Sequence, residues 1–89
     1  MNKQKFKQIV NEGIDRNKNF MVVKIETEGN PAPEIIINSK ENFSKKTNYY
    51  DKAYNENMEL IKAKEAGKLI RITDVLMTSN LNDLLWFVY

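Results

Sequence analysis

Apolar and polar residues alternate with the period of an α-helix at the start of the chain. One face of residues 3–16 collects the apolar and small side chains, while charged and amide side chains fill the remaining faces. The segment DRNKN that follows contains asparagines suited to a cap and a turn. We therefore predict an amphipathic helix whose buried face consists of Phe6, Ile9, Val10, Gly13 and Ile14.

From Phe20 the period changes to two, which is typical of a β-strand. Met21, Val23 and Ile25 would point to one side of this strand, with polar and apolar residues mixed on the other. The segment EGNPAP leads to a short second strand, Glu34–Asn38, whose three isoleucines suggest burial on both faces. The two runs predict a β-hairpin with a loop stiffened by prolines.

A second helix is expected to follow the hairpin. Asn38 is placed to cap it, and Glu41 three residues later completes a capping box. The helix is expected to continue to about Ala66, with Gly67 as its C-terminal stop.

Three of the chain's four tyrosines lie within six residues of this predicted helix. At about 100° per residue, Tyr50 and Tyr54 share a stripe with Phe43 and Ile61, which we interpret as the core-facing side. Tyr49 lies on a shoulder of the helix beside two lysines. A core position for Tyr49 and a contact with a base or a protein partner are equal alternatives.

The last third of the chain predicts two more strands. KLIRITDVLM has the alternation of a third strand, and TSNLND is a cluster of turn residues. The short, aromatic segment LLWFVY favours a fourth strand over a short helix. The predicted fold is one α+β domain spanning residues 1–89, in the order α-β-β-α-β-β. Its sheet is four-stranded and mostly antiparallel, with the helices packed on one face.

The composition excludes several kinds of active site. The 89 residues contain no cysteine and no histidine, which removes disulfides, thiolate metal sites and the commonest general base. Asp74 and Asp83, near the ends of predicted strands, could form an acid–base pair, but turn capping explains them better. We therefore expect a non-enzymatic protein with no catalytic, cofactor-binding or metal-binding residues.

The formal charge of +2 is too small to indicate nucleic-acid binding by itself. No apolar segment is long enough to span a bilayer or resembles a signal peptide, so we expect a cytoplasmic protein with no membrane partner. The first nineteen residues are the only distinctly basic block. A solvated helix face explains them most simply, and the alternative is weak nucleic-acid binding through Lys3, Lys5, Lys7, Arg16 and Lys18.

The final segment LLWFVY is the most apolar part of the chain and contains its only tryptophan. A strand has two faces, and a core this small cannot enclose both, unless the first helix covers the second one. Exposed apolar surface of this size usually marks a protein interface. The rigid loop EGNPAPE is either a second recognition segment or a simple connector. We therefore predict a protein partner or a second copy of the chain, contacted through Trp86, Phe87, Tyr89, Tyr49, Pro31 and Pro33.

The segments NPAPEIIIN, YYDKAYNENMELI and GKLIRITD give the chain the character of a known group of proteins. It resembles small proteins of unassigned role that are encoded by phages and prophages of low-GC Gram-positive bacteria. The resemblance implies an accessory protein of a mobile element. Such proteins often block a host or defence component or sequester a small signalling molecule. A further hypothesis is therefore an oligomer that sequesters a nucleotide signal in a pocket of lysines and tyrosines.

Overall fold

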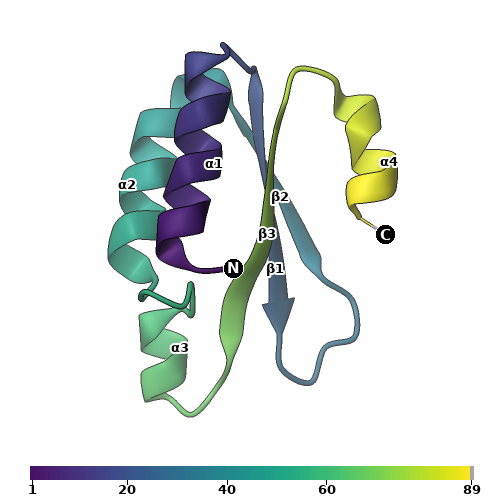
Figure 1. Cartoon of the computed structure of the whole chain (residues 1–89). Coiled ribbons are helices and arrows are strands. Elements are labelled where there is room, and N and C mark those ends of the chain that lie inside the picture. The colour runs from purple at the N-terminus through teal and green to yellow at the C-terminus, as the bar shows by residue number, and fades with distance from the viewer. Residues whose placement is uncertain (89) are drawn as a thin grey trace.

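The computed structural model describes residues 1–88, in which an antiparallel sheet separates the two longest helices on one face from the last short helix on the other (Figure 1). The three strands of this sheet lie in the order β2-β1-β3. The α+β class is confirmed within the described residues. The elements are α1 (Lys3–Asp15), β1 (Phe20–Thr27), β2 (Glu34–Ser39), η1 (Lys40–Asn42), α2 (Phe43–Ala53), α3 (Ile61–Glu65), β3 (Ile70–Thr78), η2 (Leu81–Asp83) and α4 (Leu84–Phe87).

The prediction of helix α1 is confirmed in its position, because local residues determine both of its ends, but Ile14 was placed on the buried face and is 44% exposed. The Asn2 side chain caps the first turn by accepting a hydrogen bond from the Lys5 amide at 2.8 Å. At the other end Asn17 adopts a φ of 60°, and the Lys18 amide donates to the Gly13 carbonyl at 2.9 Å. This pattern is a Schellman motif, in which asparagine tolerates the left-handed backbone.

Strand β1 is the centre of the sheet and pairs antiparallel with both neighbours. Its alternate residues Met21, Val23 and Ile25 point toward α1 and α2 and join the core, as predicted. Opposite Lys24 and Ile25 the register of β3 shifts, which leaves Thr73 as an extra residue in a β-bulge. The bulge keeps Ile72 and Val75, three positions apart, on the same buried side.

The prediction of one helix from Asn38 to Ala66 is wrong. Asn38 is a buried residue of β2, and its Nδ2 donates to the Met21 carbonyl at 3.2 Å, so it caps nothing. Helix α2 ends at Ala53, and α3 begins only at Ile61. Gly67 does end α3, with a φ of 80° in the position predicted for it.

The break between α2 and α3 is made by the Asn55 side chain. Its Oδ1 accepts from the amides of Asn57 and Glu59, both at 3.0 Å, and its Nδ2 donates to Glu59 Oε1 at 3.0 Å. Asparagine offers the backbone partners that compete with helical hydrogen bonds. The loop returns the chain to the sheet, where the Ile72 amide donates to the Met58 carbonyl at 2.9 Å.

The main core lies between the sheet and the pair α1 and α2. Tyr50 and Tyr54 are buried, and the rings of Phe6 and Tyr50 meet edge to face at 5.7 Å. Helix α1 comes closest to β3 at Gly13, where a Cβ atom would lie 2.3 Å from Met77 Cβ. The absence of a side chain at this position therefore sets the distance between helix and sheet.

The prediction that residues 84–89 form a fourth strand, with all helices on one face, is wrong for the described residues. Leu84–Phe87 form the helix α4, which lies on the face of the sheet opposite α1 and α2 (Figure 1). Residues 84 and 87 share one side of a helix, and Phe87 is accordingly buried, with Lys24 of β1 beside its ring. In residues 1–88 no helix has the length and apolarity needed to cross a membrane.

Candidate functional site

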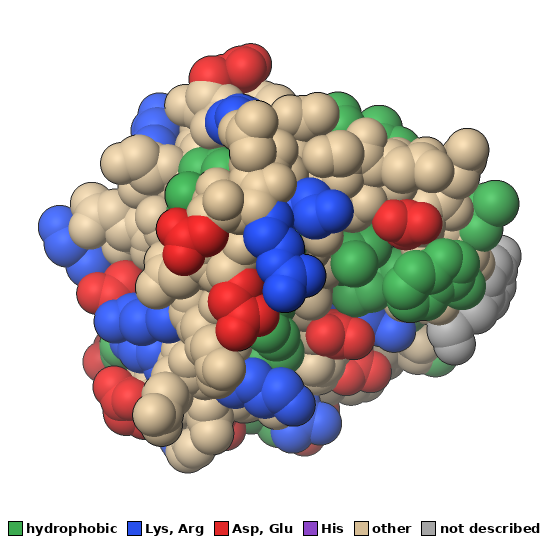
Figure 2. Space-filling model, turned by 45° about the horizontal axis from the view of Figure 1, so that its top comes forward, with side chains coloured by type: hydrophobic (Ala, Val, Ile, Leu, Met, Phe, Trp, Pro, Cys, Tyr) green, Lys and Arg blue, Asp and Glu red, His purple; other side chains and the backbone are tan. Residues whose placement is uncertain are grey.

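Three neighbouring apolar side chains of η2 and α4 project into solvent. Leu85 is 72% exposed, Trp86 is 66% exposed and Leu81 is 41% exposed. We call these three residues the α4 patch. Figure 2 shows hydrophobic side chains gathered on the side of the molecule where α4 lies. Scattered apolar side chains are normal on a protein surface, but three within six consecutive residues of η2 and α4 form a patch.

Polar contacts and one buried ring hold the α4 patch in place. The Thr78 hydroxyl lies 2.6 Å from Asp83 Oδ2, and the Asn80 side chain accepts from the Asn82 amide at 3.0 Å at the start of η2. On the inner side of α4 the Phe87 ring is 7% exposed, and Lys24 Nζ lies 5.9 Å from its centre. These contacts fix which side chains of α4 face outward.

Ile37 lies on the same face of the sheet as α4. It pairs with Val22, and it alternates with Ile36, which packs on the opposite face against the main core. Its side chain is 47% exposed. The face of the sheet that carries α4 is therefore only partly covered by the described residues.

The other predicted protein contacts are not assembled with Trp86. Tyr49 is half exposed on α2, across the sheet from α4, and Lys46 Nζ lies 5.8 Å from its ring centre. Pro31 is exposed and Pro33 is half-buried in the loop between β1 and β2. Phe87 was predicted as a contact and is buried, which corrects that prediction. Tyr89 lies outside the described residues.

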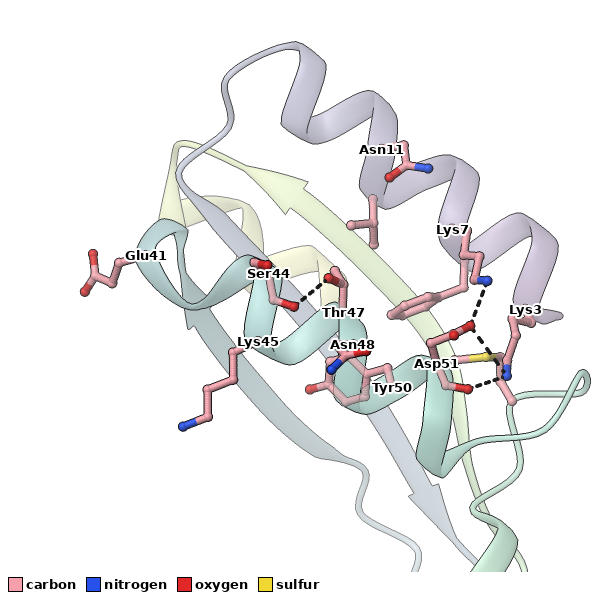
Figure 3. Close-up of a pocket in the computed structure, with 13 residues that line it drawn as sticks. Lys3, Lys7, Asn11, Glu41, Ser44, Lys45, Thr47, Asn48, Tyr50 and Asp51 are labelled. Atoms are coloured by element: carbon pink, nitrogen blue, oxygen red, sulfur yellow. Dashed lines mark hydrogen bonds and ion pairs between the residues drawn. The ribbon is translucent and has the colours of Figure 1, made fainter.

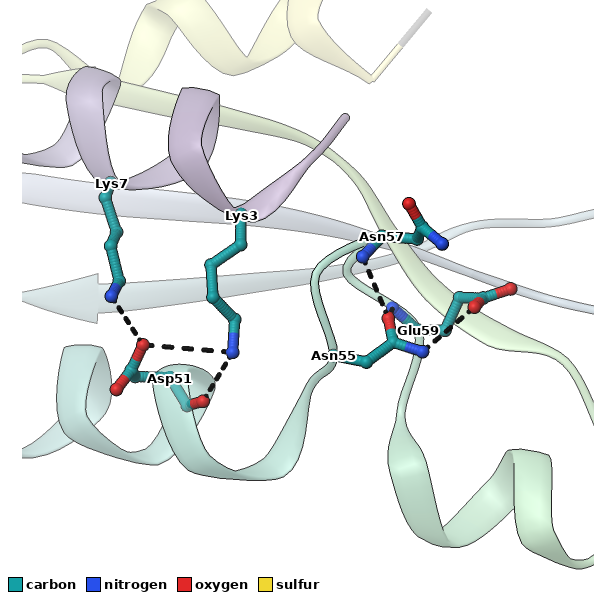
Figure 4. Close-up of polar contacts among 6 residues, drawn as sticks. All are labelled: Lys3, Lys7, Asp51, Asn55, Asn57 and Glu59. Carbon is teal, nitrogen blue, oxygen red and sulfur yellow. Dashed lines mark hydrogen bonds and ion pairs between the residues drawn. The ribbon is translucent and has the colours of Figure 1, made fainter.

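The basic residues of the alternative nucleic-acid site do not form one patch. Lys7 Nζ lies 2.7 Å from Asp51 Oδ1, and Lys3 Nζ donates to the Asp51 carbonyl at 2.7 Å (Figure 4). Arg16 and Lys18 follow the far end of α1, and Lys5 is exposed. Nucleic-acid binding stays an untested prediction.

The contacts of Lys3 and Lys7 clamp α1 to the C-terminal end of α2. The Asp51 carbonyl is one of the last in α2 and has no helical partner, so a lysine ammonium stabilises it and the negative end of the helix dipole. A hydrogen bond and the charge of Lys7 lower the pKa of the Asp51 carboxyl below its ordinary value. The same hydrogen bond and the negative charge of Asp51 raise the pKa of Lys7 above its ordinary value.

A groove of about 740 Å³ runs between α1 and α2, with Phe6 and Tyr50 among the residues of its lining (Figure 3). Asp51 occupies one end together with its two lysines. Lys45 and Glu41 extend away from the groove. Among the described residues, Lys3 and Lys7 at the groove are paired with Asp51, and the other polar lining groups include the amides of Asn11 and Asn48 and the hydroxyls of Ser44 and Thr47. Sequestration of a nucleotide stays an untested prediction.

Asp74 and Asp83 are each used locally. The Asp74 carboxylate accepts from the Val75 amide at 2.9 Å, and that of Asp83 contacts Thr78.

Sequence reasoning missed the groove and the clamp at Asp51, since both join segments some 40 residues apart. The one available signal was the i, i+4 spacing of Lys3 and Lys7, which places both on one side of the helix.

No family model, curated protein or solved structure matches this chain.

Proposed function

We propose that this chain is a non-enzymatic protein that binds a protein partner through the α4 patch. The observation that carries the proposal is the exposure of Leu85 and Trp86, at 72% and 66%. Tryptophan is the residue type most enriched among side chains that dominate binding energy. Exposed apolar surface on one element is the usual mark of an interface.

The rigidity of the α4 patch supports the same function. The hydroxyl of Thr78, the carboxylate of Asp83 and the buried ring of Phe87 fix the short helix before any partner arrives. A surface that is already ordered loses little conformational entropy on binding. The tryptophan ring would therefore insert into a partner's pocket as a pre-positioned anchor.

The class of partner follows from the resemblance to phage and prophage accessory proteins. It favours a host or defence protein, whose surface the chain would occupy and block. The complementary site on that partner is expected to be an apolar pocket that accepts an indole ring. A rim of polar groups around the pocket would match the polar surroundings of α4.

The proposal is tested by capture from a bacterial host lysate followed by reconstitution with the purified partner. Trp86→Ala is expected to weaken the reconstituted complex by about 30-fold, the loss of about 2 kcal/mol that defines a dominant interface residue. The matched control is Ile61→Ala on α3, which removes a 37% exposed apolar side chain away from α4. This control is expected to change the affinity less than threefold.

Thermal melts check that both variants are folded at the temperature of the binding assay. Equal binding by Trp86→Ala and the wild type would refute the proposal. So would a failure to capture any protein that the wild type retains and Trp86→Ala loses.

A further inference from the structure

The two edge strands of the sheet, β3 and β2, differ in how their outward backbone groups are covered. At the β3 edge the Leu60 amide donates to the Ile70 carbonyl at 2.7 Å, and Glu59 forms a bridge with Arg71. The bulge at Thr73 interrupts the same strand. Cover and bulges are both ways in which proteins prevent the pairing of an edge strand with another chain.

The β2 edge has neither protection. β2 pairs only with β1, and no hydrogen bond within residues 1–88 involves its outward backbone groups. Its sequence, EIIINS, contains no proline or lysine within the strand and runs without a bulge. A regular apolar edge of this kind is a template for a further strand.

We propose that β2 pairs antiparallel with β2 of a second copy of this chain, about a two-fold axis at Ile37. Residues that lie opposite each other in a continuous sheet share a face, so a symmetric pair must be centred on a residue. With Ile37 at the axis, Ser39 of each copy lies opposite Ile35 of the other, and Glu34 faces Lys40, the first residue of η1 directly after the other copy's β2. With Ile36 at the axis, Glu34 would face Asn38 and the charges would be unmatched.

Charge complementarity therefore favours a second copy of this chain as the partner of β2, and it favours the pairing centred on Ile37. Opposite charges across an antiparallel pair stabilise it, and the long Lys40 side chain can reach Glu34 from the first position after the strand. The symmetry forms this charge pair twice. Both side chains are exposed in the single chain. Lys40 Nζ contacts Asn17 Oδ1 there, and it can exchange this neutral partner for a carboxylate. The two half-exposed Ile37 side chains would meet at the axis on the α4 face.

The dimer is a six-stranded sheet in the order β3-β1-β2-β2-β1-β3. Its two-fold axis runs perpendicular to the sheet, so both copies of α4 lie on the same face. The pairing uses backbone groups of β2 and leaves Leu85 and Trp86 outside the contact between strands. This inference is therefore independent of the proposed function.

Analytical ultracentrifugation of the full chain over a range of concentrations tests the pairing. The wild type is expected to dimerise. Glu34→Lys and Lys40→Glu are each expected to weaken the dimer at least about tenfold, since each places like charges opposite one another twice. The double variant restores both pairs and is expected to return to within about threefold of the wild type. The matched controls are Glu28→Lys in the hairpin loop and Lys62→Glu on α3, which make the same charge changes elsewhere.

Recovery in the double variant is the decisive result, because misfolding of a single variant cannot produce it. Amide hydrogen exchange gives a second readout, in which the β2 amides of the wild type exchange more slowly as the concentration rises. A monomer at every concentration would overturn the proposal. A dimer insensitive to both charge reversals but abolished by Trp86→Ala would also overturn it, and would place the contact on the α4 patch.

Discussion

The packing of α1 on β3 makes one substitution unusually informative. A Cβ atom added at Gly13 would lie 2.3 Å from Met77 Cβ, 2.4 Å from Cγ and 2.9 Å from Cε. Carbon atoms in contact are normally about 3.5–4.0 Å apart, so the helix must move by more than 1 Å. The closest atom is the Cβ of Met77, and a change of side-chain rotamer does not move a Cβ atom.

Two effects of Gly13→Ala on the free energy of unfolding oppose each other, and the larger one decides whether the variant is more or less stable. Alanine is favoured over glycine inside a helix by about 0.8–1.0 kcal/mol. Overpacking of a well-filled interior costs about 1–3 kcal/mol. Because the added Cβ would lie more than 1 Å too close to Met77, the cost at Gly13 falls toward the upper end of this range. We therefore expect Gly13→Ala to lower the free energy of unfolding by about 1–2 kcal/mol.

Urea denaturation followed by circular dichroism measures this change. The control is Glu12→Ala, an exposed change on the same helix that should shift stability by less than about 0.5 kcal/mol. In a Met77→Gly background the clash is gone, and Gly13→Ala is expected to become stabilising. If Gly13→Ala stabilises the otherwise wild-type chain, α1 does not lie on β3 as described.

Three further predictions address the loop, the tyrosines and α4. Asn55→Ala removes three hydrogen bonds of the loop and should lower the free energy of unfolding by about 2 kcal/mol, measured by urea denaturation; an unchanged midpoint would show that the asparagine does not make the break. Burial raises the pKa of Tyr54 to about 12, so its contribution to stability is complete below about pH 10 and is lost as the pH rises toward 12. Tyr54→Phe should therefore lose less stability than the wild type over that range, and equal losses would contradict the shift. Phe87→Ala should cost about 3 kcal/mol whereas Trp86→Ala should cost less than about 0.5 kcal/mol, and a reversed order in thermal melts would mean that α4 is turned the other way.

The elements that could be predicted are those whose signals are local. The caps of α1 lie within the helix or next to it, and the alternation of β1 reports a strand with one face in the core. Gly67 predicts a helix end because the residue after a helix often adopts a left-handed backbone, which glycine tolerates. Each of these features depends on residues no more than a few positions apart.

The errors occur where two patterns fit the same residues. Six consecutive apolar residues bury one side equally well as a strand or as a helix, so periodicity could not decide the state of residues 84–89. The Asn80 side chain, which accepts from the Asn82 amide, favours a helical start over a strand. In the predicted long helix, Asn55 and Asn57 are residues that disfavour a helix interior. The helical spacing of the aromatic residues nevertheless fitted one continuous helix.

The candidate site was predicted in part. The excess of apolar residues at the end of the chain correctly pointed to exposure of Trp86, but the wrong secondary structure assigned Phe87 to the surface as well. The clamp at Asp51 depends on residues 44–48 positions away in sequence, and the groove beside it requires the same tertiary contact. Neither could be found without the fold.

The fluorescence of Trp86 tests the central claim most directly, because it is the only tryptophan in the chain. Acrylamide should quench its emission in the dilute free protein almost as strongly as it quenches indole in water. Addition of the captured partner should then reduce the quenching several-fold, as the ring becomes enclosed. An indole that is already shielded in the free chain, or one that stays equally accessible in the complex, would contradict binding through the α4 patch.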